Sequence, residues 1–261
     1  MILFSKILGK EGYDLIILHG LFGMGDNWNT LGKMFSKHCK VHLIDLRNHG
    51  RSLHSSDFNY DVMSDDILEY MYHHNIINPI ILGHSLGGKV AMKLAFTYPN
   101  KLKKLIIVDI APKEYKSNFY RELLAVLYKI PLEDFDKREQ IDELLSDTFY
   151  NKEMRFFLLK NLYRNEKKQF AWRFNIDILL EKVQNIEDAS FVLGKLDVPT
   201  FFIRGGNSDY INLDDEDLIN NHFANFSIST INGAGHWLHA EKPKLFYDEV
   251  ISALLLEDFK K

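Results

Sequence analysis

Short runs of apolar residues alternate with longer segments of helical periodicity along most of the chain. The runs predict strands at residues 14–18, 41–45, 79–82, 104–109, 200–204 and 226–231, and the periodic segments predict helices at 28–37, 61–74, 86–98, 215–222 and 245–257. A further strand at residues 2–7 leaves little sequence before Asp14, so any antiparallel hairpin that opens the sheet is reduced. This alternation is typical of an α/β protein with a mostly parallel sheet flanked by helices.

The alternation stops between residues 112 and 190. This segment has no glycine, is rich in leucine, aromatic and charged residues, and predicts helices at 120–129, 137–145, 152–162 and 175–183. Strands resume at Pro199. An all-helical segment between two strands of one sheet favours a cap inserted into a single domain. We therefore expect a core of residues 1–111 and 191–261 and a helical cap of residues 112–190.

The segment Gly83-His84-Ser85-Leu86-Gly87 joins the strand predicted at 79–82 to the helix predicted at 86–98. A G-x-S-x-G segment in this position is a nucleophile elbow, which holds the serine hydroxyl in a sharp turn above the sheet. The glycines leave space where a Cβ would crowd neighbouring backbone, and the helix N-terminus directs its amides at whatever bonds to that serine. A chance glycine-rich turn is the alternative, but it does not account for the strand and the helix on either side.

A serine hydroxyl needs a base within hydrogen-bonding distance to become a good nucleophile. In hydrolases with this elbow, the chain order is serine, acid and then histidine. His236 directly follows the last predicted strand, in a loop with glycines, and is the expected base. His239 has the helical spacing to form a metal-binding pair with it. Glu241 is the only acid close by in sequence and fits no ligand pattern, so we expect no metal.

Two aspartates compete for the role of the acid that orients this base. Asp109 ends the strand predicted at 104–109, at the edge where open α/β sheets place their functional groups. Asp209 follows the strand predicted at 200–204 across a polar loop, the usual place of the acid in many such hydrolases. In a purely structural role, Asp109 would cap the first helix of the insertion and Asp209 would stabilise a turn. These patterns leave both candidates open.

An oxyanion hole needs two backbone amides. Leu86, directly after the nucleophile, supplies one of them. The other is expected from the loop at residues 19–23, and we assign it to Leu21, with Phe22 next to it. His19 is expected to hold this loop by hydrogen bonding rather than to transfer protons.

With these residues in place, the chain resembles the α/β-hydrolase superfamily over its whole length and, within it, the YbfF-type esterases and related abhydrolase-domain proteins. The stretches that carry the resemblance are residues 19–23 with 27–28, 45–52, 83–87, 108–112, 172–175, 205–208 and 233–243. The resemblance implies hydrolysis of acyl esters or thioesters without a cofactor, beneath a helical cap. It also implies an acid after the strand that follows the nucleophile helix, which favours Asp109. Some relatives place the acid near Asp177, but here that residue lies in a helical pattern rather than at a strand end.

Aromatic side chains are concentrated in the predicted cap. They are Phe119, Tyr120, Phe156, Phe157, Trp172 and Phe174. They favour an apolar acyl pocket, although the same residues would also serve to pack the cap helices together. We expect the substrate pocket to be lined by Phe22, Trp172, Arg173 and Trp237. Arg173 would either bind an anionic head group or form an ion pair.

Composition narrows the class of partner. The 261 residues are 46% hydrophobic and 26% charged, with a formal net charge of -4, so nothing favours nucleic acid or an anionic membrane as a partner. Cys39 is the only cysteine, which excludes an intrachain disulfide and a cysteine-rich zinc site. The chain shows no signal-peptide pattern and no apolar run of about 20 residues, so we expect a cytoplasmic protein without a membrane span. The patterns do not specify an oligomeric state.

Together, these residues predict a serine hydrolase that cleaves a small-molecule ester or thioester through an acyl-enzyme on Ser85. Haloalkane dehalogenases and epoxide hydrolases place an aspartate at this position and are therefore disfavoured. Carbon–carbon bond hydrolases and lyases keep the serine triad, so the motifs do not separate them from esterases. A catalytically silent protein of the same fold that binds a ligand is the alternative from a different class.

Overall fold

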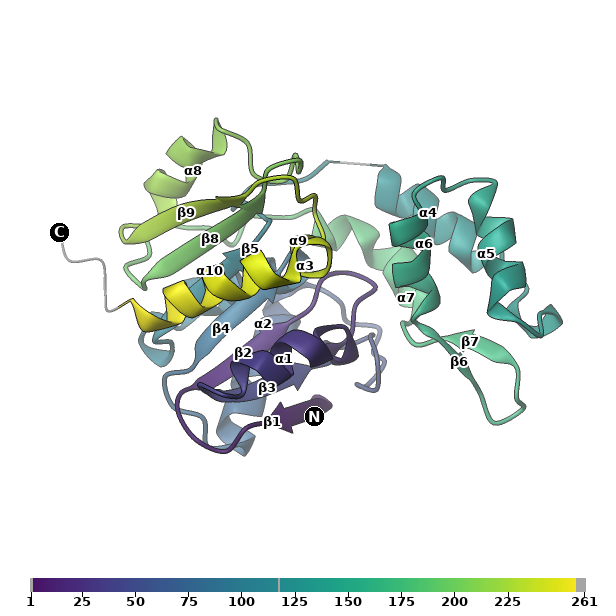
Figure 1. Cartoon of the computed structure of the whole chain (residues 1–261), viewed down its shortest axis with the longest axis horizontal. Helices are drawn as coiled ribbons and strands as arrows, with labels where there is room; N and C mark the ends of the chain where they lie inside the picture. Colours follow the sequence, from purple (N-terminus) through teal and green to yellow (C-terminus); the bar gives the residue numbers. More distant parts are fainter. Residues whose placement is uncertain (1, 117, 257–261) are drawn as a thin grey trace.

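The computed structural model describes residues 2–116 and 118–256 and contains a seven-stranded sheet with helices on both faces (Figure 1). The sheet consists of β1 (Ser5–Leu8), β2 (Asp14–Leu18), β3 (Lys40–Ile44), β4 (Ile80–His84), β5 (Lys104–Val108), β8 (Thr200–Gly205) and β9 (Phe226–Ile231). Their order is β1-β3-β2-β4-β5-β8-β9, and neighbouring strands are parallel except β1 with β3. The predicted α/β fold is confirmed, with its antiparallel opening reduced to the short strand β1.

Side chains from alternate positions of the strands form two apolar layers. The helices that flank the sheet are α1 (Asn29–Phe35), α2 (Tyr60–His73), α3 (Leu86–Thr97), α8 (Asp215–His222) and α10 (Pro243–Leu255). Ile16 and Ile81 pack on the side of α2, α3 and α8, whereas Ile17 and Leu82 pack on the side of α1 and α10. Because both faces are covered, the strands read as near-continuous apolar runs, and the sequence therefore predicts the parallel strands within two residues. Residue 257 of the helix predicted at 245–257 lies outside the described residues.

Short helical turns connect these elements. They are η1 (Gly25–Trp28), η2 (Pro99–Lys101), η3 (Leu132–Asp134), η4 (Val183–Ile186) and α9 (Leu238–Glu241). Within residues 2–116 and 118–256, no helix is long and apolar enough to cross a membrane.

The segment between β5 and β8 stands beside the sheet, where Figure 1 shows it in teal and green. It contains the helices α4 (Phe119–Tyr128), α5 (Arg138–Ser146), α6 (Lys152–Leu159) and α7 (Ile176–Lys182), and the strands β6 (Leu162–Arg164) and β7 (Phe170–Trp172). Each of the helices predicted there has a counterpart. The expectation of an all-helical segment was wrong, because β6 and β7 pair antiparallel as a small hairpin.

The hairpin escaped prediction for a local reason. Leu162 and Trp172 are buried and lie opposite each other in the hairpin. Each strand is too short for an alternation of apolar and polar residues to be recognised in the sequence. The turn between the strands runs from Asn165 to Lys168, whose amide donates to the Asn165 carbonyl at 2.9 Å. Lys168 adopts the left-handed φ of 64° that glycine or asparagine usually takes in such a turn. The position with the left-handed φ therefore lacks the residue types that usually mark it.

Candidate active site

Ser85 occupies a strained turn between β4 and α3. Its φ of 51° and ψ of -116° lie outside the regions that a serine normally adopts. A Cβ on Gly83 would lie 2.3 Å from the carbonyl oxygen of Gly87, and one on Gly87 would lie 2.4 Å from that of Leu18. The turn thus requires both glycines of the elbow, and it presents the Ser85 side chain at the carboxyl edge of the sheet.

Asp109 directly follows β5 and is fully buried, also with a left-handed φ of 50°. Its carboxylate accepts hydrogen bonds from the Gly205 amide at 3.0 Å, from the Ser208 hydroxyl and from Nδ1 of His236 at 2.7 Å. Asp209, the competing acid, is exposed. The carboxylate bonded to the histidine is therefore that of Asp109.

His236 follows β9 and is held on two sides. Besides its hydrogen bond to Asp109, its ring stacks on that of Tyr210, with centroids 3.8 Å apart and an interplanar angle of 17°. His236 and Ser85 line the same cavity. Within the described part of the chain, the Ser85 hydroxyl forms no hydrogen bond, so no protein group competes with a substrate for it.

The two backbone amides expected in the oxyanion hole lie beside Ser85. Leu21 and Leu86 line a cavity that Ser85 also lines. Among the residues that the structure describes, neither amide donates to a protein acceptor. The neighbouring Phe22 amide instead donates to Nε2 of His49 at 3.3 Å. The assignment to Leu21 and Leu86 stays a prediction that this geometry supports.

Two buried histidines and one asparagine hold the loop that carries Leu21. Nδ1 of His19 donates to the Gly20 carbonyl at 2.8 Å, while its Nε2 accepts from the Leu46 amide at 3.0 Å. Burial lowers the pKa of His19 to about 4 and that of His49 to about 3, so both rings are neutral at physiological pH. From the inserted segment, the Asn161 side-chain amide donates to the Phe22 carbonyl at 2.6 Å. His19 thus holds the loop by hydrogen bonds.

A third buried histidine, His239, packs against His84 of the elbow. His239 stacks on Trp28 with centroids 4.3 Å apart and lies 4.7 Å from the ring of His84. Nε2 of His84 in turn contacts the His236 carbonyl oxygen at 2.9 Å. The second histidine of the His-Trp-Leu-His stretch therefore packs beneath the site.

Because these buried histidines are neutral, we expect acid to destabilise the fold. In the unfolded chain a histidine has a pKa of about 6.5, whereas burial lowers the pKa of His19 to about 4 and the pKa values of His49 and His239 to about 3. Between these values the unfolded state binds more protons, so stability is present above about pH 6.5 and is lost as the pH falls. Each histidine adds a slope that approaches about 1.4 kcal/mol per pH unit. Urea unfolding between pH 7 and 5.5 measures this slope, and an unchanged free energy of unfolding would contradict the prediction.

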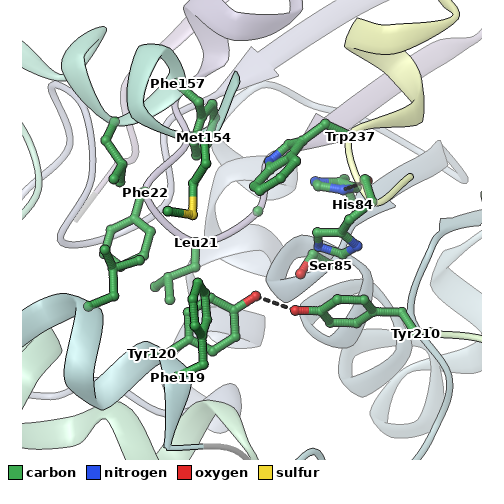
Figure 2. Close-up of a pocket in the computed structure, with 14 residues that line it drawn as sticks. Leu21, Phe22, His84, Ser85, Phe119, Tyr120, Met154, Phe157, Tyr210 and Trp237 are labelled. Carbon is green, nitrogen blue, oxygen red and sulfur yellow. Dashed lines mark hydrogen bonds between the residues drawn. The ribbon is translucent and has the colours of Figure 1, made fainter. Parts of the chain in front are cut away.

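The cavity beside Ser85 has a volume of about 210 Å³ and an almost entirely apolar lining (Figure 2). The core contributes Gly20, Leu21, Phe22, His84, Ser85, Tyr210, His236 and Trp237, and the inserted segment contributes Phe119, Tyr120, Leu123, Met154, Phe157 and Leu158. Phe22 and Trp237 therefore lie where the sequence predicted them.

Trp172 and Arg173, which were also expected in the substrate pocket, do not line this cavity. Trp172 belongs to β7 and stacks on Phe174 with centroids 5.1 Å apart, and Phe174 separates it from Phe22. The Arg173 guanidinium lies 4.8 Å from the ring centre of Tyr163. Both side chains are therefore engaged in contacts within the inserted segment.

The sequence reasoning also missed two residues of the site. Ser208 and Tyr210 reach Asp109 and His236 from the loop after β8, while Asp209 between them is exposed. Neither residue type is itself a signal of catalysis. Residues 205–208 carried only the family resemblance, so nothing in the sequence assigned a role to either side chain.

A strained serine elbow with an aspartate–histidine pair at the carboxyl edge of a parallel sheet defines the α/β-hydrolase class. A family model described as alpha/beta hydrolase fold matches residues 14–243, and the chain belongs to this family.

An esterase/lipase of Haemophilus influenzae is 38% identical over 92% of this chain and 81% of its own. Esterase YbfF of Escherichia coli is 31% identical over 92% and 91%. A solved marine microorganism esterase has 39% identity and a TM-score of 0.93, covering 97% of this chain and 99% of its own. The resemblance to YbfF-type esterases is thus confirmed.

Proposed function

We propose that the protein hydrolyses carboxylic esters of small molecules through an acyl-enzyme on Ser85, with His236 as the base and Asp109 as the acid. The observation that carries this proposal is the 2.7 Å hydrogen bond between Asp109 and His236 at the cavity that Ser85 lines. The relatives named as esterases and lipases support an ester as the bond that is cleaved. A thioester would follow the same steps.

In the acylation step, His236 removes the proton from Ser85 as Oγ attacks the carbonyl carbon of the ester. Nδ1 of His236 donates to Asp109, which leaves Nε2 as the atom that accepts this proton. The carbonyl oxygen becomes negatively charged and accepts hydrogen bonds from the Leu21 and Leu86 amides. Because the cavity lining is almost entirely apolar, these bonds act in surroundings where they are stronger than in water.

The same groups complete acylation and then carry out deacylation. His236 gives its proton to the leaving alcohol, and the acyl group stays on Ser85. In the deacylation step, His236 takes a proton from water as the water oxygen attacks the acyl carbonyl. His236 then returns this proton to Oγ of Ser85 as the bond between Oγ and the acyl carbon breaks and the free acid leaves. Asp109 stabilises the imidazolium in both steps, and the Gly205 amide and the Ser208 hydroxyl hold its carboxylate in place.

Active-site titration tests this proposal. We expect a fluorophosphonate to label the protein with one equivalent and peptide mapping to locate the label on Ser85. In rapid mixing with 4-nitrophenyl acetate, we expect a burst of one equivalent of 4-nitrophenol, as an accumulating acyl-enzyme produces. Protein unfolded in urea is the control and should not be labelled. A label on another serine, or a labelled protein that cleaves no ester, would overturn the proposal.

A further inference from the structure

Two cavities meet at Ser85 and differ greatly in size. The larger has about 210 Å³ and the smaller about 30 Å³. They share four lining residues, which are Leu21, Ser85, Tyr120 and Tyr210. An ester bound at Ser85 has an acyl half and an alcohol half, so each half has a cavity of its own.

A pair of tyrosines forms the wall between the cavities. The hydroxyl groups of Tyr120, from α4, and Tyr210, from the loop after β8, are hydrogen-bonded to each other, and Figure 2 shows this bond beneath Ser85. Burial raises the pKa of both phenols, so the bond persists over the physiological pH range. The Tyr115 hydroxyl donates to the Tyr210 carbonyl at 2.5 Å, and the Tyr210 ring stacks on His236. The wall is therefore fixed from both the inserted segment and the core.

The position of the catalytic groups assigns a half of the ester to each cavity. His236 must protonate the leaving oxygen, and it lines only the larger cavity. Leu86, whose amide is assigned to the oxyanion, lines only the smaller one. The leaving alcohol therefore extends into the larger cavity, and the acyl chain extends into the smaller one.

A buried lysine belongs to the lining of the smaller cavity. Lys89 is buried there between the rings of Tyr60 and Tyr115, 5.7 and 5.1 Å from their centres. Its Nζ donates to the carbonyl oxygens of Glu187 and Asp188 at 3.0 and 2.7 Å, so its hydrogens are directed at the backbone rather than at a ligand. At about 30 Å³ against about 210 Å³, this cavity accommodates a much shorter group than the larger one does.

We propose, resting on the function proposed above, that the substrates are esters of a short, uncharged acyl group, acetyl to butyryl, with a larger apolar alcohol. The wall formed by Tyr120 and Tyr210 then determines the specificity, because a longer acyl chain meets it together with the buried Lys89. The larger cavity takes the alcohol, and its lining offers no carboxylate, lysine or arginine to a charged one.

Two ester series test the assignment of the halves. With 4-nitrophenyl acetate, butyrate and octanoate, which share one alcohol, we expect kcat/KM to fall at least tenfold from butyrate to octanoate. With ethyl, butyl and octyl acetate, which share one acyl group, we expect kcat/KM to rise with the length of the alcohol. Rates are measured below the solubility limit and per active site titrated with fluorophosphonate. An octanoate rate at or above the butyrate rate, or a fall along the acetate series, would overturn the proposal.

A matched pair of variants on α4 tests the wall. Tyr120→Phe removes the bond to Tyr210 but keeps the ring, and we expect the octanoate-to-butyrate ratio of kcat/KM to rise at least fivefold. Tyr128→Phe makes the same chemical change at an exposed position of the same helix and should leave this ratio unchanged. Equal ratios in the two variants would exclude the tyrosine pair as the determinant. Loss of labelling in the unmodified protein would instead refute the proposed function itself.

Discussion

Replacement of Ser85 by alanine is expected to lower kcat for 4-nitrophenyl acetate by about 10⁴- to 10⁶-fold and to abolish labelling by a fluorophosphonate. The substitution removes the attacking oxygen but leaves the pair of Asp109 and His236, the amides of Leu21 and Leu86 and the cavity in place. The residual rate would then come from water attack on a bound, polarised ester. Steady-state rates and intact-protein mass spectrometry measure the two effects.

A serine on the far side of the fold provides the control for this variant. Ser252 is exposed on α10, and Ser252→Ala should keep full activity and full labelling. Labelling of Ser85→Ala at one equivalent would show that another residue is the nucleophile. Because alanine keeps the Cβ at φ 51° and, as far as the structure describes the chain, no hydrogen bond of the hydroxyl is lost, we expect its thermal unfolding temperature to stay close to that of the unmodified protein.

Asp109→Asn should lower kcat by about 10⁴-fold, while Asp209→Asn should change it by less than about twofold. An amide at position 109 can donate a hydrogen bond to Nδ1 of His236, which favours the tautomer with its proton on Nε2. That tautomer cannot accept the proton of Ser85. The exposed Asp209 provides the same chemical change directly before Tyr210, and it therefore controls for general effects of charge.

Equal thermal unfolding temperatures of the two asparagine variants would show that the difference lies in chemistry rather than in folding. A large loss of kcat in Asp209→Asn with none in Asp109→Asn would reverse the assignment of the acid. The pair of variants thus decides the one choice that the residue pattern alone left open.

The parallel strands could be predicted from the sequence, because a strand that is buried on both faces consists of a nearly continuous run of apolar residues. The sequence also located Ser85 and His236, whose positions follow from chain order around the elbow and the last strand. It could not decide between Asp109 and Asp209, because both follow strands that end at the same edge. That choice depends on the adjacency of β5 and β8, which brings the Gly205 amide to the Asp109 carboxylate.

The inserted segment was harder to predict for a different reason. Its helices carry strong periodicity, but the orientation of Trp172 and Arg173 depends on a hairpin of three-residue strands. At Lys168 the hairpin has a lysine in the left-handed conformation, which glycine or asparagine usually adopts. The sequence at this position therefore does not indicate a hairpin turn. The tyrosine pair at the cavities joins positions 90 residues apart, a contact that no local pattern encodes.

The hydrogen bond from Asn161 to the Phe22 carbonyl limits how freely the inserted segment can be exchanged. Since Phe22 adjoins Leu21, the segment above the site helps to shape the backbone of the core beneath it. A chimaera that received its cap from another hydrolase would inherit new cavity walls but lose this tether. Its transplanted cap would have to supply an equivalent donor at the same place to hold the loop that carries Leu21.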